Sequence, residues 1–376
     1  MNTRRYDLDW LRIIAILLLH LFHSAMPFVS EWGWHIKNPE TSNLFLEFNY
    51  FLSKWRMPIL FFISGIGTVF VLNQFNAGHY VLQRAKRLLV PLLFGMLVVV
   101  PPQIYFERIF SGVSYNSYFE FFPSIFTTGA YPNGNLSWHH LWFIMYLFVY
   151  SLLFIPIFLF LNSEAGKKVV EFIANSPKGL GLYYSIIVLY SASFLYFWFP
   201  EETHALVNDW AGFTRYFLFF IFGGFIGTNT TFWNSIENNR KLHLKFAFFS
   251  ITFINVLRWN DMEPEWGWNF PNLLFLLLRD FNAWFWVLAI LGYGKKYLNI
   301  KTKFLDYANE AIYPFYILHQ TFIVVITYYV VQVKNESILN KYLFVTFISF
   351  ILTMGVYEFL IKPYNSVRFF FGMKPK

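Results

Sequence analysis

The sequence predicts an all-α integral membrane protein, a polytopic transmembrane helical bundle of about ten spans with both termini cytoplasmic. Composition is the first observation: 57% of the 376 residues are hydrophobic and only 13% are charged, whereas soluble domains carry about 25% charged residues. The second observation is that apolar windows of membrane-spanning length, or nearly so, recur along the whole chain. The third is the distribution of Lys and Arg between the intervening loops. We expect a single membrane domain over residues 1–376.

The apolar windows define the expected spans in order. We place them at 11–29, 57–73, 88–106, 141–161, 181–199, 213–229, 244–257, 271–293, 311–333 and 342–361. The first has full span length and no small-residue cleavage site after it, so we expect a retained helix rather than a signal peptide. The seventh is short and begins near His243 and Lys245, which suits a tilted, re-entrant or snorkelling segment.

Basic residues test this count independently, because Lys and Arg gather in cytoplasmic loops. With a cytoplasmic N-terminus, nineteen of the 29 fall in the inner loops or at the two ends. This bias accounts for the net charge of +8 without nucleic acid, and we expect no nucleic-acid partner. The sequence contains no cysteine, which excludes disulfides, thiolate catalysis and a Cys-based metal site.

Polar residues form a stripe along the first span. Arg12 and His23 are eleven residues apart, and Asp9 and His20 repeat this spacing; eleven residues are almost three helical turns, so all four share a face. Ionisable groups in a span cost free energy and usually face a functional interior. A catalytic histidine and a structural one that bonds to neighbouring helices both fit this pattern.

Local spacing also suggests partners within the stripe. Asp9 precedes Arg12 by three residues and can pair with it on the helix. His20 and His23 could chelate a metal, but the sequence places no third ligand nearby, so we predict no metal site. Ser64, in FFISG, could be a nucleophile, but Ser-Gly in a span is more often a close-packing device, and we leave it out of the catalytic set.

Three segments occur together in a recognisable order. They are RRYDLDWLRIIAILLLHLFH at the N-terminus, Arg84-Ala85-Lys86-Arg87 after the second span, and WHHLWFIMYLFVY opening the fourth. Together they resemble the acyltransferase-3 family of integral membrane O-acyltransferases. In that family an Arg or Lys separated from a His by ten residues marks the first span, and Arg-x-x-Arg marks the cytoplasmic start of the third. The late segment NEAIYPFYILHQTFIVV resembles the branch with the glucan biosynthesis protein C succinyltransferases.

The resemblance implies an acyltransferase of the bacterial inner membrane. It would move an acyl group, acetyl or succinyl, from cytoplasmic acyl-CoA to a hydroxyl of an extracytoplasmic glycan or glycolipid, with acyl-CoA as substrate and no bound cofactor. His23 would be the general base. Arg12, with Asp9, would serve the donor end or order the site. Guanidinium groups bind phosphate in a bidentate way, so Arg84 and Arg87 would bind the donor; the alternative for both is positive-inside anchoring.

Other polar residues are candidates for an acceptor or acyl pocket. They are His20, Arg56, Gln103, Glu107, His140 and His319. Arg56 could hold the free carboxylate of a succinyl group or anchor at headgroup level beside Trp55. His139 and His140 fit an aromatic interface as well as a sugar site, and His319 fits a structural His–Tyr network as well as a catalytic one.

A protein of another class would also place ionisable groups inside helices. An exporter or flippase of glycans or lipid-linked sugars is the alternative, although such transporters favour inverted repeats or broken helices, and we find neither convincingly. The expected partners are acyl-CoA, the glycan or glycolipid acceptor and membrane lipid.

Overall fold

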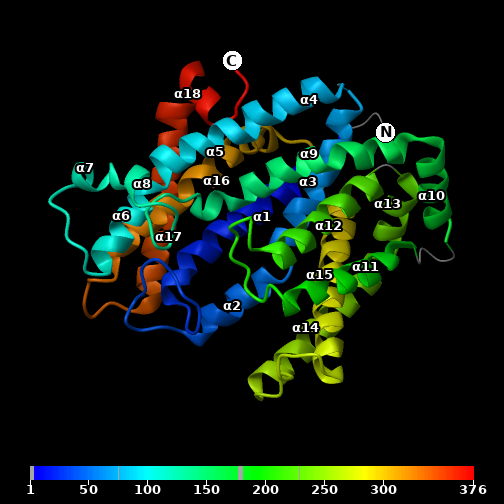
Figure 1. Ribbon diagram of the computed structural model, residues 1–376, viewed down its shortest axis with the longest axis horizontal. Helices are drawn as coiled ribbons and strands as arrows, with labels where there is room; N and C mark the ends of the chain where they lie inside the picture. Colours follow the sequence, from blue (N-terminus) through cyan, green and yellow to red (C-terminus); the bar gives the residue numbers. More distant parts are fainter. Residues whose placement is uncertain (1–3, 75, 177–180, 228) are drawn as a thin grey trace. The chain divides into compact units, whose positions relative to one another are not determined.

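The computed structural model is built almost entirely of helices, as predicted for a helical membrane bundle (Figure 1). It describes residues 4–74, 76–176, 181–227 and 229–376. Two isolated β-bridges, Val29 with Ser42 and Ala130 with Leu136, occur in loops. The chain divides into two compact units, each assembled from three separate segments. The expectation of one domain over residues 1–376 stays a prediction.

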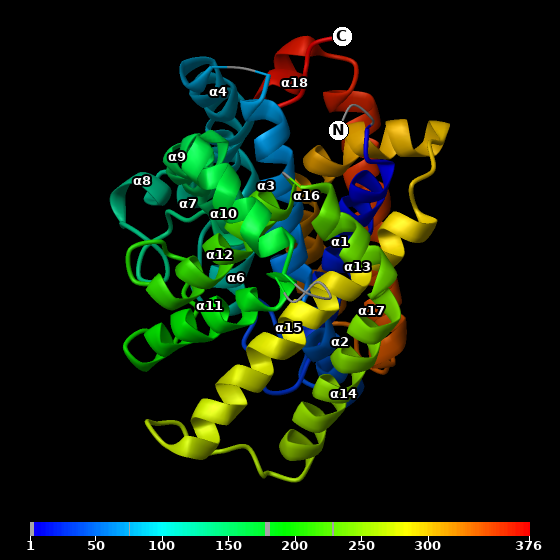
Figure 2. The same cartoon turned by 90° about the vertical axis from the view of Figure 1, so that its right-hand side faces the viewer.

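Unit 1 comprises Met1–Ala15, Ser53–Val81 and Val149–Lys301. Its helices are α3 (Arg56–Leu72), α10 (Glu164–Ala174), α11 (Tyr184–Ser193), η6 (Phe194–Phe197), α12 (Trp210–Gly227), α13 (Thr230–Asn238), α14 (Arg240–Trp259) and α15 (Phe270–Tyr297). Within it α3 packs along α12, and Figure 2 shows α14 and α15 side by side.

Unit 2 comprises Ile16–Leu52, Leu82–Phe148 and Thr302–Lys376. Its helices are η1 (Met26–Phe28), α2 (Asn43–Ser53), η2 (Ala85–Leu89), α5 (Val90–Phe94), η3 (Gly95–Val99), α6 (Pro101–Phe110), α7 (Tyr118–Phe121), α8 (Ser124–Thr127), η4 (His139–Leu141), α16 (Lys303–Val330), α17 (Ile338–Val356), η7 (Tyr357–Ile361) and α18 (Asn365–Phe370). Helix α16 packs against both α6 and α17. Helices α1 (Tyr6–Ala25), α4 (Ala77–Arg84) and α9 (Trp142–Asn162) each contribute several residues to both units, and Ser53, the last residue of α2, belongs to unit 1.

Eight helical segments among the described residues are long and apolar enough to cross a membrane, so the protein is a multi-pass membrane protein. They are Tyr6–Phe28, Asn43–Leu72, Ala77–Phe110, His139–Asn162, Trp210–Gly227, Phe270–Tyr297, Lys303–Val330 and Ile338–Ile361. Each overlaps one predicted window, although residue 228 of the window 213–229 lies outside the described residues.

The other two windows are helical but fall short of this standard. The window 181–199 contains a shorter apolar helix, Tyr184–Phe197. The window 244–257 lies in α14, whose first six residues, RKLHLK, carry three cations and lower the apolar character of the helix. The count of ten spans and the cytoplasmic placement of both termini therefore stay predictions.

Small residues allow α3 and α12 to approach closely in unit 1. A Cβ atom at Gly65 would lie 2.0 Å from the carbonyl oxygen of Phe220, and one at Gly223 would lie 1.9 Å from that of Phe62. Ser64 donates a hydrogen bond of 2.7 Å to the Leu60 carbonyl of its own helix. The SG pair therefore lies in a tight helix contact, the packing role expected for it.

Side-chain caps set the start of the long helices of unit 2. Thr302 accepts a hydrogen bond of 3.0 Å from the backbone N–H of Leu305 at the start of α16, and Ser337 accepts one of 3.1 Å from Asn340 at the start of α17. These caps satisfy backbone donors that have no partner inside the helix. They fix where α16, which carries His319, begins.

Candidate active site

Two buried histidines meet in unit 2. The Nδ1 atom of His23, near the end of α1, lies 2.9 Å from the Nε2 atom of His319 in α16. His23 is 9% exposed and His319 is fully buried. Their ring planes differ by only 3°. Two residues that the sequence marked separately thus form one hydrogen-bonded pair.

The hydrogen bonds of this pair define its tautomers. His319 Nδ1 lies 2.7 Å from the backbone carbonyl oxygen of Tyr316. A carbonyl oxygen only accepts, so Nδ1 of His319 carries the proton and, in the neutral ring, Nε2 accepts. The Nδ1–H of His23 therefore donates to His319, and the lone pair of neutral His23 lies on Nε2. An imidazole held in this way can act as a general base through Nε2.

Further polar side chains surround the pair. His140, in η4, has Nε2 3.0 Å from the carbonyl oxygen of Ile317, and its ring centroid lies 5.4 Å from that of His319. The Tyr316 hydroxyl donates to the carbonyl oxygen of His140. Gln103, in α6, donates a 2.8 Å hydrogen bond to the hydroxyl of Thr321, with its Nε2 3.5 Å from Nδ1 of His140. The structure therefore brings His23, Gln103, His140 and His319 together.

His20 lies on the same unit but bonds elsewhere. Its Nε2 is 3.0 Å from the backbone carbonyl oxygen of Thr346 and 3.4 Å from the Ser349 hydroxyl, both in α17. Its ring centroid is 6.0 Å from that of His319. This arrangement matches a histidine that joins neighbouring helices, and a role in an acyl or acceptor pocket stays a prediction.

Glu107 is the centre of a second polar group in unit 2. One of its carboxylate oxygens accepts a hydrogen bond of 3.0 Å from the hydroxyl of Tyr131, and the other bonds Nδ1 of His35. His139 stacks on His35 with a centroid distance of 4.6 Å. Burial, together with the charge of Glu107, raises the pKa of Tyr131 to about 12. Tyr131 therefore stays a hydrogen-bond donor at neutral pH.

The segment that carries His35 is anchored on both sides. Ile36 is fully buried against Val324 and Val331 of the α16 region. The ammonium group of Lys37 donates to three backbone carbonyl groups, including those of Met26 and Trp32 at 3.1 Å each. Burial lowers the pKa of Lys37. His35 is thus held in place although it lies outside any helix.

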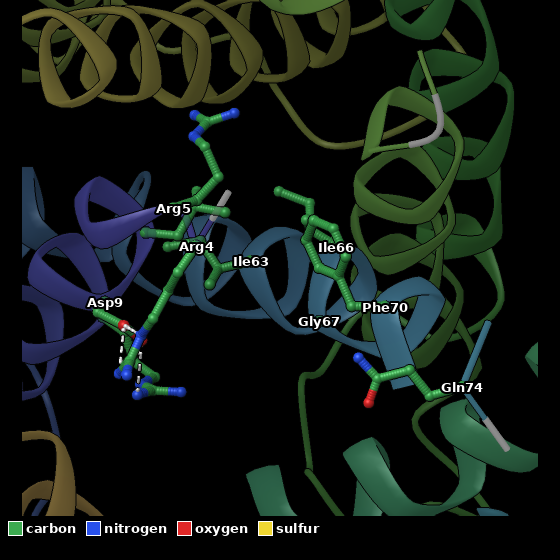
Figure 3. A pocket seen from close by; sticks show the side chains of 10 residues that line it. Arg4, Arg5, Asp9, Ile63, Ile66, Gly67, Phe70 and Gln74 are labelled. Atoms are coloured by element: carbon green, nitrogen blue, oxygen red, sulfur yellow. Dashed lines mark hydrogen bonds and ion pairs between the residues drawn. The ribbon is translucent and has the colours of Figure 1, made fainter. Parts of the chain in front are cut away.

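Unit 1 contains a basic cavity at the N-terminal end of α1. The cavity has a volume of about 430 Å³ and is lined by Arg4, Arg5, Leu8, Asp9, Arg12, Ile63, Ile66, Gly67, Phe70 and Gln74. Asp9 pairs with Arg12 at 3.2 Å, as predicted from their spacing, and with Arg4 at 3.0 Å. Figure 3 shows Arg4 reaching toward Asp9 while Arg5 points the opposite way. Arg5 pairs with Asp7 at 2.5 Å and lies over the ring of Trp233.

Arg84 and Arg87 lie at a helical irregularity. Residues Ala85–Leu89 form a π-helical segment, η2, directly after Arg84, and such segments often occur at functional sites. The hydroxyl of Tyr313 in α16 donates a hydrogen bond of 3.0 Å to the carbonyl oxygen of Arg87. This bond fixes the backbone beneath Arg87, whose side chain is exposed.

Arg56 begins α3 in unit 1 and is 4% exposed, so it does not belong to the unit that holds the histidine pair. Its role as an acyl-carboxylate partner stays a prediction. Unit 1 also contains a buried ion pair that sequence reasoning missed, between Arg215 of α12 and Asp280 of α15, with the Ser193 hydroxyl donating to Asp280 at 2.6 Å.

Two further polar residues of unit 2, His35 and Gln320, were not predicted from the sequence. His35 lies in a loop, where helical periodicity says nothing, although it sits in the aromatic stretch WGWH. Gln320 directly follows His319 on α16, and its side-chain Nε2 lies 3.2 Å from both Nε2 of His35 and Oε1 of Gln103. A polar residue next to a candidate histidine inside an apolar span was the available signal.

Comparisons with known proteins identify the family of the chain. Residues 5–358 match the Acyl_transf_3 family model, described as an acyltransferase domain. Glucans biosynthesis protein C of Escherichia coli strain UMN026 / ExPEC is 24% identical over 329 residues, covering 84% of this chain and 81% of that protein. The protein of the same name from Escherichia coli strain SMS-3-5 / SECEC is 28% identical over 178 residues.

The alignment with the latter relative covers 46% of this chain and 42% of the relative's length, so the chain spans less than half of that protein. No solved structure matches. The family match, by contrast, extends over nearly the whole chain and includes His23, His319 and the basic residues near the start of α1. The chain therefore belongs to the acyltransferase-3 family and is a membrane acyltransferase.

Proposed function

We propose that the protein transfers an acyl group, acetyl or succinyl, from cytoplasmic acyl-CoA to a hydroxyl of an extracytoplasmic glycan or glycolipid. The observation that carries this proposal is the buried His23–His319 pair, with Nδ1 of one ring 2.9 Å from Nε2 of the other. Family membership supports acyl transfer. The name of the relatives, glucans biosynthesis protein C, supports a glucan-like acceptor.

His23 is the general base of the proposed reaction. As the acceptor hydroxyl oxygen forms a bond with the thioester carbonyl carbon, its proton passes to Nε2 of His23. The resulting imidazolium keeps its Nδ1–H bond to His319, and the Tyr316 carbonyl holds the His319 ring in turn. Collapse of the tetrahedral intermediate breaks the carbon–sulfur bond, and the coenzyme A thiolate leaves and takes up the proton. The products are the acyl ester and free coenzyme A.

Two basic groups support phosphate binding, one in each unit. In unit 1, Arg12 and Arg4 lie beside Asp9 at a cavity whose remaining lining is largely apolar. In unit 2, Arg84 directly precedes the π-helical segment η2, and Arg87 lies within it, three residues further along the chain. Coenzyme A carries phosphates, which guanidinium groups bind through charge-assisted, often bidentate hydrogen bonds. Each group is a separate candidate for binding the donor.

The acceptor requires neutral and acidic hydrogen-bonding groups. Gln103, Glu107 and His140 supply these in unit 2, and all three are less than 9% exposed. Such amide, carboxylate and imidazole groups suit the hydroxyls of a sugar, and the neighbouring Trp34 and Tyr131 offer aromatic faces. We place the enzyme in the bacterial inner membrane, with acyl-CoA, the glycan and membrane lipid as its partners and no bound cofactor in the acyl transfer itself.

Two experiments test the proposal, one on a strain that lacks the gene for this protein (the deletion strain) and one on the purified enzyme. Mass spectrometry of cell-envelope glycans from the deletion strain should show the loss of one acyl mass, which identifies both the acyl group and the acceptor. Purified protein in detergent should bind the corresponding acyl-CoA and hydrolyse it slowly. An unchanged glycan profile together with no acyl-CoA binding would contradict the proposal and favour the exporter or flippase.

A further inference from the structure

We propose that His35, Glu107 and His139 form a binding site for a divalent transition-metal ion of the zinc class. The three side chains come from separate parts of unit 2: the loop before α2, the helix α6 and the helical turn η4. Each offers one ligand atom, and these atoms all lie within 4.8 Å of one another. The acyl-transfer proposal uses Glu107 as an acceptor-binding group but assigns no metal ion to these three residues, and the present inference depends neither on that proposal nor on the family match.

The distances suit a tetrahedral ion after small side-chain movements. Zinc binds histidine nitrogen and carboxylate oxygen at about 2.0–2.2 Å, so its ligand atoms lie roughly 3.3 Å apart. Ligand atoms within 4.8 Å of one another reach that separation when each moves by about 1 Å. The ligand set of two imidazoles and one carboxylate matches zinc sites that keep a fourth position open for water or substrate.

His139 has a buried nitrogen that the ion would satisfy. Its Nδ1 lies 2.8 Å from the Ser137 hydroxyl, while its Nε2 is buried without a hydrogen-bond partner. A buried nitrogen acceptor that has no hydrogen-bond partner destabilises the folded protein. With Nδ1–H donating to Ser137, the lone pair of Nε2 is available to a metal ion.

Gln320 presents a second buried atom without a partner. Its Nε2 lies 3.2 Å from Nε2 of His35, and its Oε1 is buried without a hydrogen bond. When Nδ1 of His35 binds a metal, Nε2 of that ring carries the proton and requires an acceptor. Rotating the Gln320 amide by 180° places Oε1 beside Nε2 of His35, where it accepts that proton, and gives up the 3.2 Å hydrogen bond from Nε2 of Gln320 to Oε1 of Gln103.

The remaining surroundings are also arranged for a ligand. The hydroxyl of Tyr131 donates to Oε1 of Glu107, which leaves Oε2, the oxygen beside His35, to face the ion. His139 has a left-handed backbone, with φ of +40°, a conformation that costs free energy in residues other than glycine and clusters at functional sites. An ion here would tie the loop that carries Trp34, whose ring lies 5.4 Å from that of His23, to α6 and η4.

The test uses the full-length protein in detergent, purified through a tag without histidines and stripped with a chelator. We expect one equivalent of Zn²⁺ by elemental analysis after re-addition and dialysis. Titration with Co²⁺ should give the intense visible bands of a tetrahedral nitrogen and oxygen site. His139→Ala and Glu107→Gln should each weaken Zn²⁺ binding at least about 100-fold, and Tyr131→Phe about 10-fold, because the Tyr131 hydroxyl orients the Glu107 carboxylate.

His79→Ala is the matched control, because His79 lies in α4 and is exposed; it should bind Zn²⁺ as the unaltered protein does. Gel filtration of every variant shows whether it is folded. The Co²⁺ spectrum of the unaltered protein is a test that needs no variant. Failure of that protein to bind an equivalent of either ion, or equal binding by folded His139→Ala and by the control, would overturn the proposal. Loss of acyl transfer has no bearing on either result.

Discussion

His23 and His319 are 296 positions apart in the sequence, yet Nδ1 of the first lies 2.9 Å from Nε2 of the second. The Tyr316 carbonyl oxygen, 2.7 Å from Nδ1 of His319, accepts a hydrogen bond from that nitrogen. In the neutral ring Nε2 of His319 is then the acceptor, and Nδ1 of His23 carries the proton between the two rings. In the proposed mechanism His319 is a positioning residue that fixes the tautomer of His23, as the carboxylate does in a Ser-His-Asp triad.

Replacing His319 should reduce turnover and spare donor binding. His319→Ala removes the acceptor of the His23 Nδ1–H and should lower kcat about 10²-fold, with KM for acyl-CoA changed little. His319→Gln should recover part of the loss, because its amide oxygen can accept the same proton. Steady-state kinetics of purified variants checks this. Equal activity of the alanine and glutamine variants would show that the hydrogen bond to His23 does not matter.

The two arginines at η2 should contribute to donor affinity. Arg84→Ala combined with Arg87→Ala should raise the Kd for acyl-CoA by at least about 10-fold, since each lost charge-assisted hydrogen bond is worth about 1.5–3 kcal/mol. Lys86→Ala, between them and exposed, removes one positive charge from the same turn without removing a guanidinium group and is the control. Calorimetry in detergent measures the Kd for acyl-CoA of the double variant and of the control. A donor Kd that is the same in the double variant and the control would return these arginines to the role of topology signals.

Arg12 is expected to serve the donor through the cavity of unit 1. Arg12→Gln removes the cation paired with Asp9 at 3.2 Å and should weaken acyl-CoA binding about 10-fold. Lys301→Gln is the comparison, because Lys301 is an exposed cation of the same unit that does not line the cavity. It should leave the donor Kd within about 2-fold of its original value, well under one kcal/mol. The reverse order of the two effects would contradict the assignment of this cavity.

The buried pair of Arg215 and Asp280 should contribute to stability. The Asp280 side chain is fully buried, so Asp280→Asn removes the ion-pair partner of the Arg215 guanidinium and should cost about 3–5 kcal/mol. Asp261→Asn, the same chemical change in an exposed loop, should have no measurable effect. Thermal unfolding in detergent compares the two. A Tm for Asp280→Asn equal to that of the control would mean that the pair contributes nothing.

The helical architecture was predictable because the membrane imposes a local rule. Each span must be about 20 largely apolar residues with its backbone bonded internally, and that rule located eight segments, among them Tyr6–Phe28 and Lys303–Val330. The rule gives no clear answer for a helix that is charged at one end and apolar over the rest of its length. Helix α14 is 20 residues long but begins RKLHLK, so neither length nor hydropathy alone decides whether it spans.

Within the candidate site, only interactions between residues close together in the sequence could be predicted. Asp9 and Arg12 are three residues apart, and helical geometry alone predicts their ion pair. The pairing of His23 with His319 depends on which helices are neighbours, which periodicity does not contain. His35 was missed for a related reason: it lies in a loop, and its contact with Glu107 of α6 arises only from tertiary packing.

The most direct test of the account is O-acylation by His23→Ala in the deletion strain, read by mass spectrometry of envelope glycans. Wild-type protein and the exposed control His79→Ala should restore the acyl mass lost on deletion. His23→Ala, present in the membrane at the same level, should leave that mass absent, because loss of a general base costs about 10²–10⁴ in rate. Normal acylation by His23→Ala would contradict the assignment of His23 as the base.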